Sequence, residues 1–356
     1  MAGLDPATQP RRVTSRESLW RVDTRLLGGL KGGHGELEYD RSMRIFRHFD
    51  DVAQDAKGAV VAIGNFDGVH RGHQALIAQT KGLAAKAGKP LGVLAFEPHP
   101  QEFFRPTKDS FRLTPFRVKA RLLMANGVDE MFALPFDAQM AARSADEFIE
   151  EVLVRGLGVS AVVVGNDFQF GKGRVGNVEV LKREGAKHGF DVKIIEPVLE
   201  HAGEKISSTH IRDALKAGKP DVAAKLLGHY WSVEARVDHG DKRGRTIGFP
   251  TANMQLTDCL HPAFGVYAVR ATIYEDDKAI SRHDGVANFG IRPMYKIEEP
   301  LLETYLFDFS GDLYGKHLAI EFVQYIRGEA KLDGLDALKA QIARDSNDAR
   351  KALANA

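Results

Sequence analysis

The sequence predicts two domains, an α/β domain built on a parallel sheet and then an antiparallel β-barrel that ends in a helix. Three observations lead to this prediction. The 356 residues exceed what one hydrophobic core usually organises. Strand-like apolar runs alternate with helical patterns from residue 59 to about residue 197. After about residue 228 the pattern changes to aromatic and β-branched runs with little helix between them.

The first half contains short apolar runs of the length of strands, separated by helical patterns. The runs are AVVAIG (59–64), LGVLAF (91–96), VDEMFAL (128–134), SAVVVG (160–165) and DVKIIEP (191–197). Ser144 with Glu147 forms a capping box that predicts the start of one helix. Near-continuous apolar strands that alternate with helices indicate a buried parallel sheet with helices on both faces.

The second half contains four longer runs that are typical of strands in an antiparallel sheet. They are YWSVEARVDHG (230–240), FGVYAVRATIY (264–274), LLETYLFDF (301–309) and HLAIEFVQYIR (317–327). These runs predict a small barrel. A final helix is predicted over about residues 333–354, amphipathic through Leu335, Leu338 and Ile342, and we expect that apolar face to pack. The domain boundary is placed after residue 228, which divides the compact chain into 43–228 and 229–356.

Residues 1–42 are polar, glycine-rich and mixed in charge, and we expect a flexible extension that folding and activity do not need. They have no apolar core of the kind a signal peptide needs. No apolar stretch reaches the roughly 18–20 residues that span a bilayer. The formal charge of +1 implies no general attraction to nucleic acid or to an anionic membrane. The single cysteine, Cys259, excludes an intramolecular disulfide and suits a cytoplasmic protein.

The stretch GNFDGVHRGHQ (64–74) lies between a predicted strand and a predicted helix. In open parallel sheets ligands bind beyond the carboxyl ends of the strands, where free N–H groups and helix dipoles favour phosphate. The three glycines allow the backbone to approach a ligand closely. His70 and His73 can then donate hydrogen bonds to oxygens of one polyphosphate. The alternative at this point is a turn with a solvated histidine pair.

The same stretch resembles the HxGH signature of adenylyl-transferring nucleotidyltransferases, the relatives of class I aminoacyl-tRNA synthetases. Three further stretches follow it, FEPHP (96–100), VVGNDFQFGKGRVG (163–176) and ISSTHIRDAL (206–215). Their order resembles the FAD synthetase module of bacterial bifunctional riboflavin kinase/FAD synthetases. The resemblance implies a Rossmann-like nucleotidyltransferase domain in which ATP meets a flavin.

Residue roles in the first domain follow from this resemblance. Hydroxyls just before a helix can cap it and contact phosphate, and an arginine one turn later can reach a triphosphate. The implied catalytic residues are His70, His73, Ser207 and Arg212. The implied ATP contacts are Gly64, Phe66, Asp67, Gly68, Gly72, Ser208 and Thr209. The implied flavin contacts are Phe96, Pro98, His99, Asp167 and Phe168, with Phe170 beside them. Each phenylalanine taken alone is equally typical of core packing, and His210 replaces the family's usual arginine.

In the implied reaction an FMN phosphate oxygen attacks the α-phosphorus of ATP, and pyrophosphate leaves. The nucleophile is already anionic, so the reaction requires no general base. Catalysis then consists of alignment and of neutralising the charge that develops on the leaving group. Histidines, serines, glycines and an arginine suit this task.

A second set of motifs opens with GDKRGRTIGFPTANM (240–254), whose glycines and basic residues suit a flap over phosphates. The Thr251 hydroxyl and the Asn253 amide oxygen are hard ligands suited to Mg²⁺, although a lone PTAN string is often just a turn. The motif is followed by GVYAV (265–269), GVANFGIRP (285–293), ETYLFDF (303–309) and DLYG (312–315). This ordered set resembles riboflavin kinase, a six-stranded barrel.

The resemblance implies phosphate contacts by Gly244, Gly248 and Pro250, and metal binding by Thr251 and Asn253. It implies a catalytic role for Glu303, because a ribityl hydroxyl needs a carboxylate to accept its proton. Strand parity does not show which way Glu303 points, since both faces of its strand are apolar. Arg327 is expected to contact the flavin or to couple the two sites, with a surface ion pair as the alternative. Met294 replaces the family's usual threonine.

The combined hypothesis is a cytoplasmic two-module enzyme of flavin cofactor synthesis. The barrel phosphorylates riboflavin with ATP and Mg²⁺ to give FMN, and the first domain adenylylates FMN to FAD. Its partners are these small molecules, with no nucleic acid and no membrane, and the sequence leaves a homo-oligomer open. The alternatives are a nucleotidyltransferase for another phosphorylated acceptor and a flavin-binding regulator without catalysis. The intact set of site residues argues against a regulator that has lost catalysis.

Overall fold

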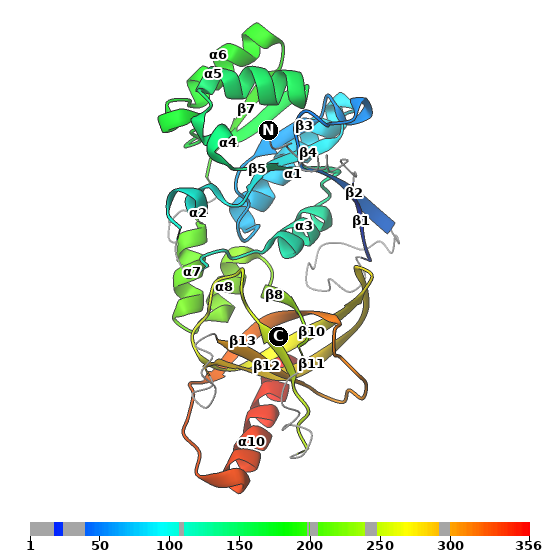
Figure 1. The fold of residues 1–356 in the computed structure, drawn as a ribbon, viewed down its shortest axis with the longest axis vertical. Coiled ribbons are helices and arrows are strands. Elements are labelled where there is room, and N and C mark those ends of the chain that lie inside the picture. The colour runs from blue at the N-terminus through cyan, green and yellow to red at the C-terminus, as the bar shows by residue number, and fades with distance from the viewer. Residues whose placement is uncertain are drawn as a thin grey trace, which may run out of the picture.

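The protein is described from a computed structural model. The structure describes residues 18–23, 40–106, 110–197, 199, 206–238, 248–291 and 300–356. Figure 1 shows an elongated molecule, with the α/β domain in its upper part and the β-barrel domain and helix α10 in its lower part. The order of the two domains agrees with the sequence prediction.

The first domain is built on a seven-stranded sheet with the order β1-β2-β5-β4-β3-β6-β7. All neighbouring strands from β2 to β7 pair in parallel, and β1 pairs antiparallel with β2 at the edge. The parallel sheet that the apolar runs predicted is therefore confirmed. The strands are β1 (Ser18–Asp23), β2 (Asp40–Phe46), β3 (Val60–Ile63), β4 (Leu91–Glu97), β5 (Glu130–Pro135), β6 (Ala161–Gly165) and β7 (Asp191–Ile195).

Strand β1 belongs to residues 1–42, the segment that we expect to be a flexible extension. It lies inside that segment, and β2 begins at Asp40, before the predicted compact start at Met43. Without β1, strand β2 would be the edge of the sheet and would expose a row of unpaired backbone groups. Pairing of Ser18–Asp23 with β2 satisfies these groups, which gives this part of the segment a place in the fold.

Helices cover both faces of the sheet, as predicted. Alternate residues of β3 show this, because Val60 and Ala62 enter one core while Val61 and Ile63 enter the other. The helices are α1 (Arg71–Ala87), α2 (Pro100–Phe104), α3 (Phe116–Ala125), α4 (Ala138–Ala142), α5 (Ala145–Glu147), a π-helical segment Phe148–Gly156 and α6 (Val178–His188). The capping box is confirmed, since Ser144 and Glu147 each accept a hydrogen bond from the other's backbone N–H.

The second domain is a six-stranded antiparallel sheet that curls into a barrel, with the order β8-β13-β10-β11-β12-β9. An antiparallel bridge between Asp238 and Asn253 brings the two edges of the sheet together. This architecture confirms the predicted barrel with a C-terminal helix. The elements are β8 (Trp231–Arg236), β9 (Ala252–Gln255), β10 (Gly265–Glu275), β11 (Lys278–Gly290), β12 (Leu301–Leu306), β13 (His317–Arg327) and α10 (Gly334–Ala354).

Helices α7 (Ser208–Lys216) and α8 (Pro220–Leu227) join the two domains. Their buried residues, including Ile211 and Leu227, belong to the same hydrophobic core as Trp231 of the barrel. Leu113 of the first domain also enters this core, and its carbonyl accepts the Trp231 Nε1–H at 2.8 Å. The two domains therefore share one continuous packed junction rather than a loose linker.

The packing of α10 differs from the amphipathic prediction. Leu335 is 53% exposed, and the residues that α10 buries are Asp345, Ser346, Ala349 and Leu353. The carboxyl-terminal half of the helix therefore lies on the barrel, where Ala349 and Leu353 join a cluster of apolar barrel residues. The predicted apolar stripe begins in the half that extends beyond the barrel (Figure 1). The single cysteine, Cys259, is buried.

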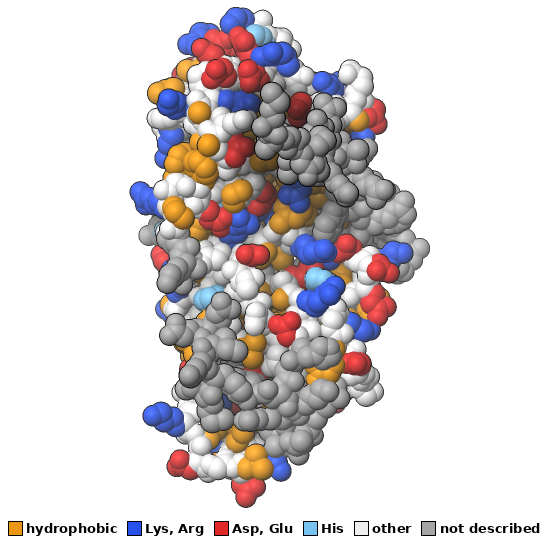
Figure 2. All heavy atoms as spheres, viewed as in Figure 1, with side chains coloured by type: hydrophobic (Ala, Val, Ile, Leu, Met, Phe, Trp, Pro, Cys, Tyr) orange, Lys and Arg blue, Asp and Glu red, His pale blue; other side chains and the backbone are white. Residues whose placement is uncertain are grey.

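Figure 2 shows acidic and basic side chains mixed over the described part of the visible face. This pattern fits the formal net charge of +1, because no single sign of charge dominates the view. Within the described ranges no helix combines the length and the apolar character that crossing a membrane requires.

Candidate active sites

The loop from β3 to α1 holds the residues that the sequence predicts to bind phosphate. Phe66, Gly68 and Val69 have φ angles of 51°, 88° and 42°, so the backbone takes left-handed conformations in this loop. A side chain at position 68 would be strained by this φ angle, and its Cβ would also lie 2.9 Å from a Leu113 methyl carbon. His70 caps α1 through Nδ1, which accepts the His73 N–H at 3.4 Å. The two histidine rings stack with centroids 3.7 Å apart, so the structure brings both predicted histidines together at the helix N-terminus.

The ISSTHIR stretch meets this loop at the start of α7. Ser207 caps the helix by accepting the His210 N–H at 3.4 Å, and the Ser208 hydroxyl donates to the Asp67 carbonyl at 2.9 Å. Arg212 donates to the Asp67 carboxylate. Thr209 and His210 are exposed on the same helix. The two halves of the predicted ATP site are therefore in contact, although more than 130 residues separate them in the chain.

Asp67 has a different environment from the other expected ATP contacts. Its side chain is buried, and Oδ1 accepts the N–H groups of Leu113 and Thr114 at 2.9 and 3.0 Å. Its other oxygen, Oδ2, accepts the Arg212 guanidinium at 2.5 Å. Both carboxylate oxygens are therefore occupied by protein donors.

The FEPHP stretch forms the end of β4 and the start of α2. His99 caps α2, and its Nδ1 accepts the Gln101 N–H at 3.1 Å. Burial lowers the pKa of His99 to about 4, mainly because the charged ring would lose its hydration. The neutral ring matches the acceptor role of Nδ1. Beneath it, Glu97 accepts from Lys119 at 2.7 Å and from Arg112 at 3.1 Å.

The predicted flavin-side phenylalanines belong to one aromatic group. The rings of Phe168 and Phe170 stack with centroids 5.4 Å apart, and Phe170 contacts Phe148 at 5.5 Å. Phe96 contacts the same Phe148 at 6.3 Å. Phe170 is 7% exposed and packs in the core, whereas Phe168 and Phe96 are only partly buried and Asp167 is exposed.

Sequence reasoning missed Phe104, which follows FEPHP in α2. Its ring is 63% exposed and lies 5.6 Å from Phe136, which in turn contacts Phe96 at 5.3 Å. An exposed aromatic ring beside a partly buried aromatic group is a surface on which a planar ring can stack. The signal was the pair Phe103–Phe104 in an otherwise polar turn.

The barrel brings three polar residues into one cross-strand row. Glu303 of β12 pairs directly with Asn253 of β9 on one side and with Asn288 of β11 on the other. Direct partners point to the same face of a sheet. Leu302 and Leu306 enter the barrel core, so Glu303 lies on the opposite, partly exposed face. The structure thus resolves the orientation that strand parity left open.

Asn253 is the member of this row that fits a metal ligand. It is 7% exposed, and within the described part of the chain its Oδ1 atom has no hydrogen-bond partner. A buried amide oxygen without a donor is unfavourable, and a hard cation would satisfy it. Thr251, Pro250 and Gly248 lie in the segment that leads into β9, whereas Gly244 and Met294 lie outside the described residues. Among the described side chains, no group of three or more His, Cys, Asp and Glu forms a metal site.

Arg327 is engaged with the C-terminal helix. Its Nε and one terminal nitrogen donate to the two oxygens of Asp345 at 2.8 and 2.6 Å, and the other terminal nitrogen donates to the Gly328 carbonyl. Asp345 is 4% exposed and also accepts from Gln341. These contacts anchor α10 to β13 through a partly buried ion pair.

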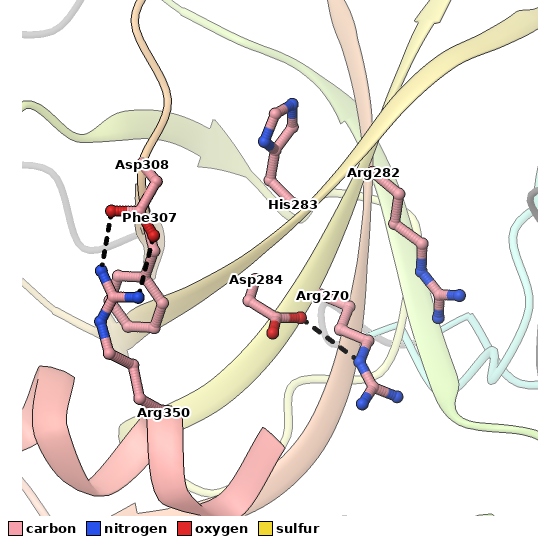
Figure 3. Close-up of a pocket in the computed structure, with 7 residues that line it drawn as sticks. All are labelled: Arg270, Arg282, His283, Asp284, Phe307, Asp308 and Arg350. Atoms are coloured by element: carbon pink, nitrogen blue, oxygen red, sulfur yellow. Dashed lines mark hydrogen bonds and ion pairs between the residues drawn. The ribbon is translucent and has the colours of Figure 1, made fainter. Parts of the chain in front are cut away.

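A separate pocket of about 410 Å³ lies between the barrel and the end of α10 (Figure 3). Its charged groups form ion pairs with one another or, for Arg282, with Glu321 of β13, which does not line the pocket. Arg350 donates to both oxygens of Asp308, Arg270 pairs with Asp284, and Arg282 pairs with Glu321. None of the predicted site residues lines it. The remaining lining residues are His283 and Phe307.

The fold and its two residue clusters define a two-domain enzyme that transfers phosphate-containing groups. Comparison with known proteins agrees with this class: the FAD synthetase family matches residues 52–210, and the riboflavin kinase family matches residues 227–353. The chain belongs to the bifunctional riboflavin kinase/FMN adenylyltransferases. This membership confirms the resemblance that the sequence motifs indicated.

The named relatives cover most of the chain. The bifunctional riboflavin kinase/FMN adenylyltransferase of Escherichia coli K12 is 42% identical over 87% of this chain and 97% of its own length. The protein of the same name from Pseudomonas fluorescens is 41% identical over 86% of this chain and 97% of its own length. A crystal structure described as a macrolide-efflux protein from Streptococcus pneumoniae has a TM-score of 0.74 and 32% identity, and covers 86% of this chain and 98% of that chain.

Proposed function

We propose that this chain converts riboflavin to FMN in its barrel and then FMN to FAD in its α/β domain. The observation that carries the proposal is that the two halves of the proposed ATP site are in contact. The loop that holds His70 and His73 meets the N-terminus of α7 through the Ser208–Asp67 hydrogen bond. Family membership supports both steps, because the two matched regions follow each other along the chain.

In the adenylyl-transfer step, His70 and His73 bind phosphate oxygens of ATP at the N-terminus of α1. Free N–H groups at this helix end and the serine hydroxyls at the start of α7 add further donors. Arg212 stabilises the charge that develops on the leaving pyrophosphate. Gly64, Phe66, Gly68, Gly72 and Thr209 shape the same site. The residues align two anions, and none of them needs to act as a base.

In the kinase step, Glu303 accepts the proton of the ribityl hydroxyl that attacks the γ-phosphorus of ATP. Asn253 and Thr251 hold Mg²⁺, and the unsatisfied Asn253 Oδ1 atom supports this assignment within the described residues. When bound, Mg²⁺ neutralises charge on the triphosphate. Gly248 and Pro250 belong to the segment that approaches the phosphates, to which the sequence also assigns Gly244.

The flavin for adenylylation binds beside Phe96, Pro98, His99, Asp167 and Phe168, with Phe104 as an additional stacking surface. The exposed Phe104 ring next to Phe136 supports this placement. Arg327 acts on the flavin of the kinase site through the position of α10. We further propose a cytoplasmic enzyme whose partners are small molecules, for which the single cysteine and balanced charge are the support.

One incubation tests the proposed function. The full chain is mixed with riboflavin, ATP and Mg²⁺, and FMN and FAD are separated over time. The expected result is FMN that appears first and then falls as FAD accumulates. Turnover of a different phosphorylated acceptor with no FAD would favour another nucleotidyltransferase, and tight flavin binding without turnover would favour a regulator.

A further inference from the structure

We propose that Asp67 is a positioning residue for adenylyl transfer, which holds Arg212 in the orientation that the leaving pyrophosphate requires. This inference rests on the proposed function above. This positioning role replaces the expectation from the sequence that Asp67 contacts ATP directly. A carboxylate repels a triphosphate, and both of its oxygens are already occupied by protein donors.

Asp67 is held on one side by backbone groups of another segment. Oδ1 accepts the N–H groups of Leu113 and Thr114, and the Thr114 hydroxyl lies 3.3 Å from the same oxygen. The Thr114 hydroxyl also accepts the Gly68 N–H at 3.0 Å. The side chain of Asp67 is 3% exposed. A buried carboxylate with this many donors has one well-defined position.

Arg212 is held from two directions. Its Nη2 donates to Asp67 Oδ2 at 2.5 Å, and its Nε donates to the Phe111 carbonyl at 2.8 Å. The guanidinium carbon lies 5.0 Å from the centre of the Phe111 ring. Among the described residues no hydrogen-bond partner is found for the third nitrogen, Nη1, and the Arg212 side chain is 15% exposed. This nitrogen is therefore the donor that a ligand oxygen can use.

Asp67 lies close to His70 in the chain, and the loop that joins them is held by a hydrogen bond to α7. His70 follows Asp67 by three residues, and the intervening Gly68 and Val69 have left-handed φ angles. The Asp67 carbonyl accepts the Ser208 hydroxyl, which ties the same loop to α7. Asp67 therefore fixes Arg212 relative to the His70–His73 pair, the geometry on which alignment-based catalysis depends.

The test compares Asp67→Asn, Arg212→Ala and the double variant in the full chain. Asparagine keeps an oxygen for the Leu113 and Thr114 N–H groups but places an amide donor opposite the Arg212 donor. The expected loss in kcat/KM for ATP in FAD formation from FMN is about tenfold to a hundredfold for Asp67→Asn. The double variant is expected to be no slower than Arg212→Ala alone, because Asp67 acts through Arg212.

Asp129→Asn is the matched control, because Asp129 Oδ2 also accepts a backbone N–H, from Leu91 at 2.9 Å, at the amino ends of strands β4 and β5. It should leave FAD formation unchanged. FMN formation in the barrel reports folding of each variant. Should Asp67→Asn fail to fold, Arg212→Lys replaces it, since lysine cannot bond Asp67 and Phe111 together and should lose a similar factor.

Two outcomes would overturn the inference. One is a kcat/KM equal to that of the wild type in folded Asp67→Asn. If Asp67→Asn does not fold, the same result in Arg212→Lys would overturn the inference. The other is a double variant whose loss equals the product of the two single losses. Failure of the proposed function has a separate signature, since the unmodified chain would then form no FAD from FMN and ATP.

Discussion

Arg121 of α3 and Glu234 of β8 form a buried ion pair across the junction of the two domains. Arg121 Nε lies 3.0 Å from Glu234 Oε2, and the two side chains are 5% and 1% exposed. The same guanidinium lies 3.9 Å from the centre of the Tyr274 ring and donates to the Asp277 carbonyl. This contact fixes the barrel against the α/β domain, so the two proposed active sites keep one relative placement.

Glu234→Gln should lower the free energy of unfolding by about 2 kcal/mol, because Arg121 loses its buried counter-ion and keeps only the partly exposed Asp277 carboxylate, 3.2 Å from its guanidinium. The matched control is Asp308→Asn, which breaks the exposed Arg350–Asp308 pair and should lower the free energy of unfolding far less, because water screens exposed charges. Chemical denaturation followed by circular dichroism measures both. Equal losses in the two variants would contradict the structural role assigned to Arg121.

The two activities should separate by mutation. Glu303→Ala should slow FMN formation by roughly 10²–10⁴-fold, because no carboxylate then accepts the ribityl proton, while conversion of added FMN to FAD continues. His73→Ala should slow the second step by roughly 10²–10³-fold and leave the first. Rates with riboflavin and with FMN as the starting flavin measure this. If either substitution abolished both steps in folded protein, the sites would not be independent.

Asn253→Ala should raise the Mg²⁺ concentration needed for half-maximal FMN formation by about tenfold, because the site loses one oxygen ligand. Thr304→Val is the matched control. Thr304 is fully buried, and its hydroxyl has no hydrogen-bond partner within the described residues, but its side chain faces the barrel core. That variant should keep the Mg²⁺ dependence and be neutral or slightly more stable. An unchanged Mg²⁺ requirement in Asn253→Ala would remove Asn253 from the metal site.

Stability should fall on acidification through the titration of His99. Its pKa is about 4 in the folded protein and 6.5 ordinarily, so the unfolded chain binds more protons between these values. The contribution of the neutral His99 ring to the free energy of unfolding is therefore fully present above pH 6.5. As the pH falls from 6.5 to about 4, the free energy of unfolding decreases by on the order of 3 kcal/mol. His99→Asn keeps a helix cap without a titrating ring and should flatten this part of the unfolding curve against pH. The same slope in wild type and variant would assign it to other groups.

Arg327 and Asp345 allow a test of how the helix supports the kinase site. Asp345→Asn breaks the two-bond ion pair and should lower the melting temperature of the barrel. If Arg327 acts on flavin only through α10, Arg327→Lys and Asp345→Asn should raise the KM for riboflavin by the same factor. A larger KM effect for Arg327→Lys would indicate a direct flavin contact.

Local patterns predicted most of the fold. Near-continuous apolar runs indicated parallel strands such as β3 and β4, because strands buried on both faces carry few polar residues. The Ser144 capping box marked a helix start from side-chain chemistry alone. Strand β1 escaped prediction because its pairing depends on the edge of β2, a partner that no local pattern specifies.

The sequence by itself determined the two folds and their order, and through its family resemblance it predicted motifs for phosphate, flavin and metal. Periodicity and turn chemistry act over a few residues, which is why the strands and helices could be predicted locally, whereas the roles of the motifs rested on the resemblance. Only the tertiary structure decided that Asp67 faces Arg212, that Glu303 shares a face with Asn253, and that Arg327 is committed to Asp345. Each of these pairs joins residues distant in the chain, so their contacts exist only after the strands and helices have packed.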